Sequence, residues 1–225
     1  MTISAIIPVW NGEAYVAEAI RSVLSQTLQV DEIIVVDDGS TDHTADIVRS
    51  FANVRLIQQE NASPGPARNT GVRASSGDWL AFLDHDDLWL PEKIETQIRM
   101  ALGHPESVAV LGLVQNFISP DLSADAQARI ECPANPLKGY TPSALTIRRE
   151  AFLKSGGWPN SERQGVEWFA HALATGVSFL EIPRVLTMRR LHQTNRTRLR
   201  AAYNQDYARI ARGMLAMRRA NQGTG

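Results

Sequence analysis

Short apolar runs alternate with segments of helical periodicity through the first hundred residues, and this alternation constrains the fold more than any other feature. The apolar runs predict strands at residues 3–9, 32–37, 54–58 and 79–83. The segments that follow them predict helices at residues 13–25, 41–51, 64–74 and 91–102. Because strands that alternate with helices form βαβ units, we expect an α/β fold built on a mostly parallel sheet.

The length of the chain fits one compact domain. Its 225 residues, 44% of them hydrophobic, are enough to bury a normal core. We divide this domain into residues 1–104, which carry the regular βαβ pattern, and residues 105–225. The sequence contains no apolar run of about 18 residues that would span a membrane, and residues 1–8 lack the features of a signal peptide. The single cysteine, Cys132, has no disulfide partner, so we expect a cytoplasmic location.

The second half of the chain is less regular. Residues 108–117 predict a further strand, and the Pro-rich stretch 119–142 predicts a long loop that is either a binding lid or an ordinary insertion. Shorter helices are expected at residues 148–154 and 166–174, each followed by glycine. A last helix after Thr197 is predicted from apolar residues that recur every three or four positions, with arginines between them.

Charge is distributed unevenly along the chain. The net charge is −1, yet residues 184–225 contain ten arginines and a single acid, Asp206, so the rest of the chain is acidic. A basic tail of this kind either docks on the acidic body, forms a solvated helix face, or contacts anionic lipid headgroups or an anionic acceptor. Peripheral contact with an anionic membrane is therefore one interpretation of the tail.

Polar residues follow the carboxyl end of each predicted strand in the first half. The loops read PVWNG after the first strand and DDGSTD after the second, and a polar stretch at residues 60–71 follows the third. The fourth strand ends in the sequence DHDD at residues 84–87. Because open α/β sheets bind ligands at the carboxyl ends of their strands, we interpret these loops as one binding site. Carboxylates this close repel one another unless a cation neutralises them, and hard oxygen ligands suit Mg²⁺ or Mn²⁺.

Four ordered motifs resemble those of the family 2 glycosyltransferases. They are IIPVWNG at residues 6–12, VDDGSTD at 36–42, ARNTG at 67–71 and FLDHDDLW at 82–89. The likeness is dense over roughly the first hundred residues and continues more thinly towards the carboxyl end. These enzymes are inverting and depend on nucleotide sugars. The resemblance implies a GT-A type α/β fold, in which a Rossmann-like mixed, mostly parallel central sheet is flanked by helices.

For the nucleotide, the resemblance implies a site built from the first loops. Asp38 is expected near the base, where a carboxylate accepts the imide proton of uracil or thymine or the N1 proton of guanine. Pro8, Val9 and Asn11 are expected to form one wall of this site. Arg68 matches the arginine that lines the nucleotide site in the family, and a guanidinium suits an anionic ligand. An internal salt bridge to a neighbouring aspartate is the alternative role for Arg68.

The Asp-x-Asp motif of the family is matched by Asp84, His85 and Asp86. The resemblance implies that Asp86 ligates a metal ion that bridges two phosphates and that Asp84 contacts the ribose or the sugar. His85 belongs to the same donor-binding segment, although alternation along an extended chain would turn it away from the metal. The Arg-x-His end of the family closes over the diphosphate, which places Arg190 at the phosphates and His192 at the metal. The expected cofactor is Mg²⁺ or Mn²⁺.

An inverting transfer also needs a general base within reach of the acceptor hydroxyl. Family members usually place an aspartate in a Glu-Asp pair after a Gly-Gly-aromatic motif, and the matching residues here are Val166 and Glu167. Glu167 is therefore the expected base, and a favourable interaction with the helix dipole is the alternative reason for a carboxylate at this position. Trp158 follows the two glycines and is expected to stack on a sugar ring, with core packing as the alternative.

Together these features predict an inverting glycosyltransferase that uses a UDP-, GDP- or dTDP-sugar, a divalent metal and a carboxylate base. Residues 1–104 would bind the nucleotide sugar and residues 105–225 an unidentified acceptor. The alternative is a catalytically silent nucleotide-sugar-binding module, because the first acid of the Glu-Asp pair is missing. A dinucleotide-binding Rossmann protein is disfavoured, because no Gly-x-Gly-x-x-Gly follows the first strand. Nucleic acid is not an expected partner, and a homodimer is a further option.

Overall fold

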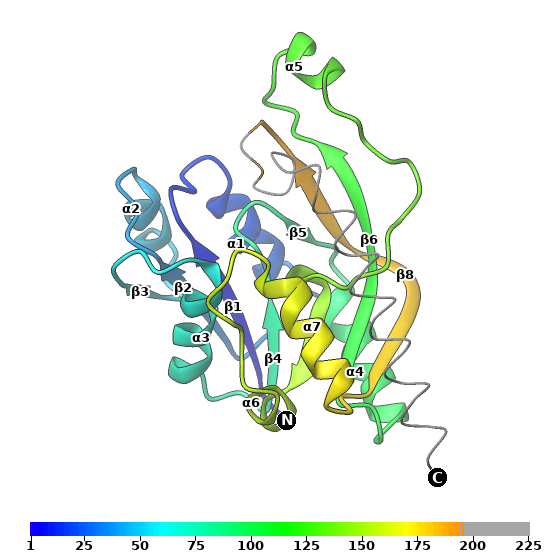
Figure 1. Ribbon diagram of the computed structural model, residues 1–225. Coiled ribbons are helices and arrows are strands. Elements are labelled where there is room, and N and C mark those ends of the chain that lie inside the picture. Colours follow the sequence, from blue (N-terminus) through cyan, green and yellow to red (C-terminus); the bar gives the residue numbers. More distant parts are fainter. Residues whose placement is uncertain (194, 196–225) are drawn as a thin grey trace.

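An eight-stranded mixed sheet runs through the centre of the computed structural model, which describes residues 1–193 and 195 (Figure 1). The strand order is β3-β2-β1-β4-β7-β6-β8-β5. The strands are β1 (Ile3–Val9), β2 (Glu32–Asp37), β3 (Val54–Gln58), β4 (Trp79–Phe82), β5 (Leu88–Trp89), β6 (Ala109–Ile118), β7 (Leu145–Arg148) and β8 (Phe179–Leu191). The pairs β2/β3, β1/β2, β1/β4 and β6/β8 are parallel, whereas β4/β7, β6/β7 and β5/β8 are antiparallel. The predicted α/β class with a mostly parallel sheet is confirmed.

Helices cover both faces of the sheet, as βαβ connections require. They are α1 (Val16–Leu24), α2 (Thr44–Arg49), α3 (Pro64–Ala74), α4 (Lys93–Gly103), α5 (Ala124–Ala128), α6 (Arg149–Lys154) and α7 (Gln164–Ala174), together with the short 3-10 helix η1 (Pro142–Ala144). Alternate residues of β1 point to opposite faces. Ile7 packs in one apolar cluster with buried residues of α1, α2 and α4. Ile6 packs in a second cluster, which includes the aromatic side chains of α6 and α7.

The first two helices begin later than the sequence pattern predicts, because side chains and turns occupy the residues before them. The N–H groups of Tyr15 and Val16 donate to the carbonyl oxygen of Gly12 at 3.0 and 2.9 Å, so a turn precedes α1. Asp42 accepts a hydrogen bond from the N–H of Thr44 at 3.0 Å, so α2 begins at Thr44 and not at residue 41. These turns keep residues 10–15 and 38–43 as loops at the carboxyl ends of β1 and β2.

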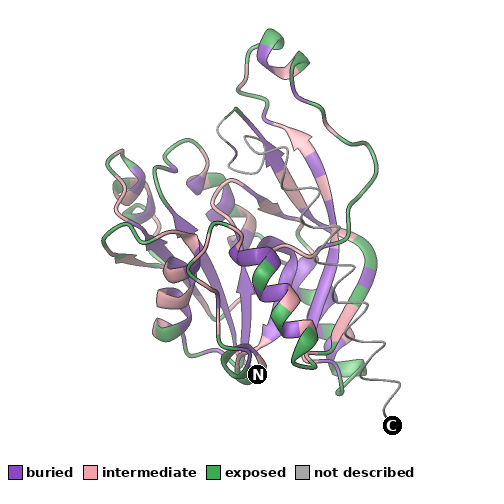
Figure 2. Ribbon diagram, viewed as in Figure 1, coloured by how far each residue is buried: buried purple, intermediate pink, exposed green. Residues whose placement is uncertain are grey.

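The second half of the chain extends the sheet instead of forming a separate layer. β7 pairs antiparallel with β4 and β6, and β8 lies parallel to β6 over most of its length. The sequence pattern did not predict β5, β7 or β8. Within the stretch expected to be one long loop, residues 124–128 form the short helix α5, which protrudes from the body at the end of a long arm (Figure 1). Figure 2 shows buried residues concentrated in the central strands and many exposed residues on the arm.

Among the described residues, no helix combines the length and apolar character needed to cross a membrane. The helix predicted after Thr197 and most of the basic tail lie outside the described residues.

Candidate active site

A turn of three carboxylates follows β4. The N–H of Leu83 still donates to the carbonyl oxygen of Ile6 on β1 at 3.0 Å, and the N–H of Asp87 closes the turn on the carbonyl oxygen of Asp84 at 3.0 Å. One carboxylate oxygen from each of Asp84, Asp86 and Asp87 lies within 4.8 Å of the others. The strand thus delivers three acidic side chains to the carboxyl-end edge of the sheet, as the sequence predicts.

His192 faces Asp86 across this edge. Its Nε2 atom lies 3.0 Å from Oδ2 of Asp86, and Nδ2 of Asn195 donates to the same oxygen at 3.3 Å. Burial alone would raise the pKa of Asp86, but the hydrogen bond from His192 and the nearby imidazole of His85 outweigh it and hold the pKa at about 2. The two residues that the resemblance assigns to the metal therefore meet, although 106 residues separate them.

Asp87 is oriented towards the protein interior. Its Oδ2 atom accepts a hydrogen bond from the hydroxyl of Ser143 at 2.7 Å, and its Oδ1 atom accepts one from the N–H of Arg190 at 3.2 Å. Burial, followed by repulsion from Asp86 and Asp84, raises the pKa of Asp87 well above its usual value. Both oxygens of Asp87 are engaged by the protein, which leaves Asp84 and Asp86 as the more accessible carboxylates of the turn.

Arg68 forms a salt bridge with Asp84 from the first turns of α3. Its guanidinium is buried, and its Nε and Nη1 atoms have no hydrogen-bond partner among the described residues. The ring of Trp158 lies 5.4 Å from its Cζ atom. The internal salt bridge that the sequence leaves open as an alternative is therefore present, and it places the positive charge beside the acidic turn.

The loops after β1 and β2 are tied together at the same edge. The N–H of Asp38 donates to the carbonyl oxygen of Val9 at 2.8 Å, and the side-chain oxygen of Asn11 accepts from the N–H of Thr41 at 2.8 Å. Asn11 adopts a positive φ of 49°, a conformation that asparagine tolerates better than most residues. Pro8 is buried within β1. The loops after β1 and β2 are thus joined by hydrogen bonds, whereas Pro8 and Val9 are themselves buried, and their predicted role in a nucleotide wall stays a prediction.

The carboxylate of Asp38 accepts hydrogen bonds from the loop that follows β3. Its two oxygens accept hydrogen bonds from Nε2 of Gln59 at 2.7 Å, from the N–H of Ala62 at 3.0 Å and from the N–H of Ser63 at 2.9 Å. Ser63 has a positive φ of 83°, so this loop is held in an unfavourable backbone conformation that the contacts with Asp38 help to maintain. Asp38 therefore shapes the loop after β3, and its predicted contact with a base remains a proposal.

His85 packs against the loop after β1. A Cβ atom placed on Gly12 would lie 2.6 Å from Cδ2 of His85 and 2.4 Å from Cγ2 of Val9, so the position accepts only glycine without rearrangement. The imidazole of His85 therefore lies directly against Gly12. Its role in binding a nucleotide sugar remains a prediction.

Arg190 lies behind the acidic turn and is 2% exposed. Its three guanidinium nitrogens donate to the carbonyl oxygen of Asp86, to Ser119 and to Glu18. The residue predicted to meet the diphosphate is thus engaged by protein acceptors in this structure.

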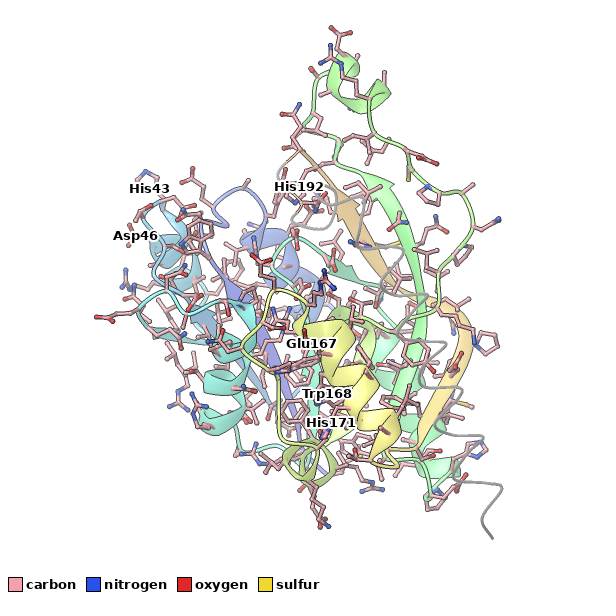
Figure 3. All side chains as sticks on the ribbon, viewed as in Figure 1. His43, Asp46, Glu167, Trp168, His171 and His192 are labelled. Atoms are coloured by element: carbon pink, nitrogen blue, oxygen red, sulfur yellow. The ribbon has the colours of Figure 1, made fainter. Side chains whose placement is uncertain are left out.

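Trp158 and Glu167 lie in different environments. Trp158 is 2% exposed, and its ring packs against Phe82 and Trp168 at centroid distances of 5.2 and 4.7 Å, which matches the core-packing alternative. Glu167 is exposed in the first turn of α7, and its Oε2 atom accepts a hydrogen bond from Ser161 at 2.6 Å. Figure 3 shows Glu167 near the upper end of α7, with His171 further down the helix.

The sequence interpretation missed several residues that hold the site together. Ser143 bridges the turn, because its hydroxyl accepts from the N–H of Asp84 at 3.1 Å and donates to Asp87. Asn195 and Glu18 support Asp86 and Arg190. No local sequence pattern points to Glu18, Ser143 or Asn195, because their contacts join distant parts of the chain.

The mixed, mostly parallel sheet flanked by helices is that of a GT-A type glycosyltransferase. The chain belongs to glycosyl transferase family 2, whose family model matches residues 4–157.

Relatives and solved structures agree with this assignment. The chain is 29% identical to the putative glycosyltransferase EpsH of Bacillus subtilis in an alignment 203 positions long, which covers 80% of this chain and 59% of EpsH. It is 46% identical to an uncharacterised glycosyltransferase of Rickettsia typhi over 99 residues, which are 44% of this chain and 31% of that protein. The chain thus spans less than two thirds of the length of these relatives.

The fold is similar to that of TarS from S. aureus. The crystal structure of TarS 1–349 in complex with UDP-GlcNAc superposes with a TM-score of 0.71 at 20% identity, over 96% of this chain and 66% of that one. The complex with UDP gives a TM-score of 0.65 at 21% identity, over 85% and 61% of the two chains. The predicted GT-A type fold is confirmed.

Proposed function

We propose that this chain transfers a sugar from a nucleoside diphosphate sugar to an acceptor hydroxyl, with inversion at the anomeric carbon. The observation that carries the proposal is the contact of 3.0 Å between Asp86 and His192, beside the pair of Asp84 and Arg68, at the carboxyl-end edge of the sheet. Ligand sites of open α/β sheets lie at this edge. The mixture of carboxylates, an imidazole and a buried guanidinium suits a diphosphate together with a cation.

The donor that we propose to test first is a UDP-sugar. TarS, whose fold is similar, has been crystallised with UDP and with UDP-GlcNAc. Asn11 is exposed directly after the buried Pro8 and Val9, and its loop, which is hydrogen-bonded to the loop of Asp38, would provide a surface for a nucleoside. GDP- and dTDP-sugars serve as the comparison donors, because a carboxylate also accepts the N–H groups of guanine and thymine.

The residues of the acidic turn fit Mg²⁺ or Mn²⁺. Their carboxylate oxygens lie within 4.8 Å of one another, and hard oxygen donors of this kind suit both ions. Asp86, Asp84 and His192 would hold the ion, because both oxygens of Asp87 are engaged elsewhere. A bound divalent ion stabilises the negative charge that develops on the leaving diphosphate.

Glu167 is proposed as the general base. An exposed carboxylate at the start of α7 can take the proton of an acceptor hydroxyl as its oxygen attacks the anomeric carbon and the bond to the diphosphate breaks. The hydrogen bond from Ser161 orients this carboxylate at 2.6 Å. Glutamate replaces the aspartate that is usual in the family, so the acceptor would lie about one C–C bond further from the helix.

Donor hydrolysis and transfer, measured with Mn²⁺ and with EDTA, test these assignments. Asp86→Ala should abolish the response to Mn²⁺, and Glu167→Gln should lower transfer by about 10²–10⁴-fold with donor binding unchanged. Asp46→Ala and Glu150→Gln are matched controls, because Asp46 is exposed on α2 and Glu150 occupies the corresponding first turn of α6. Equal activity of the native protein and Asp86→Ala would refute the metal assignment. Metal-dependent UDP binding without turnover on a broad acceptor panel would favour a catalytically silent binding module.

A further inference from the structure

The guanidinium of Arg190 makes an unusually complete set of contacts inside the protein. Nε donates to the carbonyl oxygen of Asp86 at 3.0 Å, Nη1 donates to Oγ of Ser119 at 3.1 Å, and Nη2 pairs with Glu18. The side chain is 2% exposed, whereas that of Glu18 is 54% exposed. Arg190 therefore connects a carbonyl group of the acidic turn to α1 and to the end of β6.

Two aromatic rings lie close to the same guanidinium. The Cζ atom of Arg190 lies 4.7 Å from the ring centroid of Tyr15 and 4.7 Å from that of Phe117. A guanidinium is attracted to the ring face in this geometry, and the attraction is larger where water is excluded. With 2% exposure and a protein acceptor on each of its three nitrogens, the side chain of Arg190 offers little surface to a phosphate.

The backbone of Arg190 holds the acidic turn as well. Its N–H donates to Oδ1 of Asp87 at 3.2 Å, and its carbonyl oxygen accepts from Nδ2 of Asn195 at 3.2 Å. The same Nδ2 atom donates to Oδ2 of Asp86 at 3.3 Å. The side chain and the main chain of Arg190 thus both hold the Asp86–Asp87 segment through hydrogen bonds.

We propose that Arg190 is a positioning residue, which holds Asp86 and Asp87 in place and does not contact the leaving diphosphate. Lysine cannot replace it, because one ammonium group does not reach three acceptors in the fixed geometry of a guanidinium. The orienting partners of metal-binding side chains typically contribute about 10–100-fold to metal affinity. The part of the proposal that concerns the metal rests on the proposed function, whereas the part that concerns the turn does not.

The experiment compares Arg190→Lys and Glu18→Gln with two matched controls. Arg184 on β8 pairs with Glu92 on the surface, so Arg184→Lys and Glu92→Gln make the same chemical changes in an exposed ion pair. Glu18→Gln keeps Arg190 itself and removes only a partly exposed charge, so it tests the proposal even if Arg190→Lys does not fold. Amide hydrogen exchange of the peptide covering residues 84–90 is measured without ligand, and UDP binding is measured by calorimetry with EDTA and over a range of Mn²⁺ concentrations.

The expected result is faster exchange of residues 84–90 in Arg190→Lys and, to a smaller extent, in Glu18→Gln. The Mn²⁺ concentration needed for tight UDP binding should rise by about 10–100-fold in Arg190→Lys, with UDP binding in EDTA unchanged. Weaker UDP binding in EDTA with an unchanged Mn²⁺ dependence would overturn the proposal in favour of a phosphate contact. Unchanged exchange in both variants would also overturn it. If the native protein bound no nucleotide, the proposed function would fail, while the exchange data would still decide the role of Arg190.

Discussion

Three aspartates share one turn after β4, and their neighbours give each a different chemical state. Asp84 pairs with Arg68, and Asp86 is stabilised in its charged form by His192. Asp87 is buried between a serine hydroxyl and a backbone N–H, where burial and the other two acids raise its pKa. Residues that look equivalent in the sequence therefore have different environments. Ionisation of the inward-facing Asp87 lowers the free energy of unfolding.

Asp87→Asn should stabilise the protein at pH 7 in EDTA, because the asparagine amide has no charge to bury and its oxygen still accepts one of the two hydrogen bonds that Asp87 accepts. The folded-state pKa of Asp87 lies above its ordinary value of 3.8, so its ionisation opposes folding as the pH rises from 3.8 through the folded-state pKa. The gain should therefore disappear below pH 3.8, where the native carboxyl group is already neutral. Urea denaturation at pH 3.5 and pH 7 measures the difference.

Asp84→Asn provides the contrast for this prediction. The same substitution at Asp84 removes the charged partner of the buried Arg68 and should lower the free energy of unfolding at pH 7. Stabilisation by both substitutions would mean that general repulsion in the turn, and not the burial of Asp87, determines the effect.

At the scale of elements, α4 places a lysine inside the protein. Lys93 is fully buried at the start of this helix, where its Nζ atom donates to Gln97 at 2.8 Å and to Thr146 on β7 at 3.1 Å. Nζ also lies 4.1 Å from the ring centroid of Trp89 on β5. Burial lowers the pKa of Lys93 well below its usual value, and its hydrogen-bond partners Gln97 and Thr146 are both uncharged. The contact of α4 with β5 and β7 is thus made by a polar side chain in an apolar setting.

Lys93→Met should raise the free energy of unfolding at pH 7 by about 1–3 kcal/mol, because an apolar chain of similar length fills the same space without desolvating an ammonium group. A lowered folded-state pKa means that the unfolded chain binds more protons between that pKa and 10.5, so the native protein gains stability as the pH rises over this range. The advantage of methionine should therefore shrink towards pH 10.5.

Lys154→Met is the matched control, measured by the same urea denaturation at pH 7 and pH 10. Lys154 is exposed and pairs with Glu150 on the surface of α6, where such pairs contribute little. A loss of stability in Lys93→Met would show that the hydrogen bonds to Gln97 and Thr146 are worth more than the cost of burying the amine.

At the scale of the whole molecule, the two halves of the chain share one core. β4 pairs on one side with β1 and on the other with β7, and the ring of Phe82 contacts Phe152 and Trp158 at centroid distances of 5.3 and 5.2 Å. The division at residue 104 follows a change of sequence pattern. The apolar cluster around β4, however, contains residues from both sides of this division.

A fragment of residues 1–104 should therefore fail to fold cooperatively, whereas residues 1–195 should fold. The fragment would expose one edge of β4 and the apolar face that carries Ile6, Leu80 and Phe82. Near-UV circular dichroism and the cooperativity of urea unfolding distinguish the two outcomes. A sharp unfolding transition in the fragment would mean that the first four strands and their helices are sufficient.

The sequence predicts the first part of this molecule well, because β1 and β2 are continuous buried runs and the helices between the strands have one apolar face. It does not reveal β8, whose Pro183 and arginines break the apolar pattern, or β7, which has only four residues. The meeting of Asp86 and His192 follows from a resemblance, but the support from Glu18 depends on a contact across 172 residues that no local pattern encodes.

Because β8 lies far beyond the acidic turn in the sequence, the ribosome makes the turn well before the strand that holds it. Arg190 leaves the ribosome 103 residues after Asp87, and at about 5–20 residues per second this interval lasts roughly 5–20 seconds. During that time the acidic turn of the nascent chain lacks its hydrogen bonds with Arg190. Translation therefore delays the assembly of the candidate site until β8, the last strand in the part of the chain that the structure describes, has emerged.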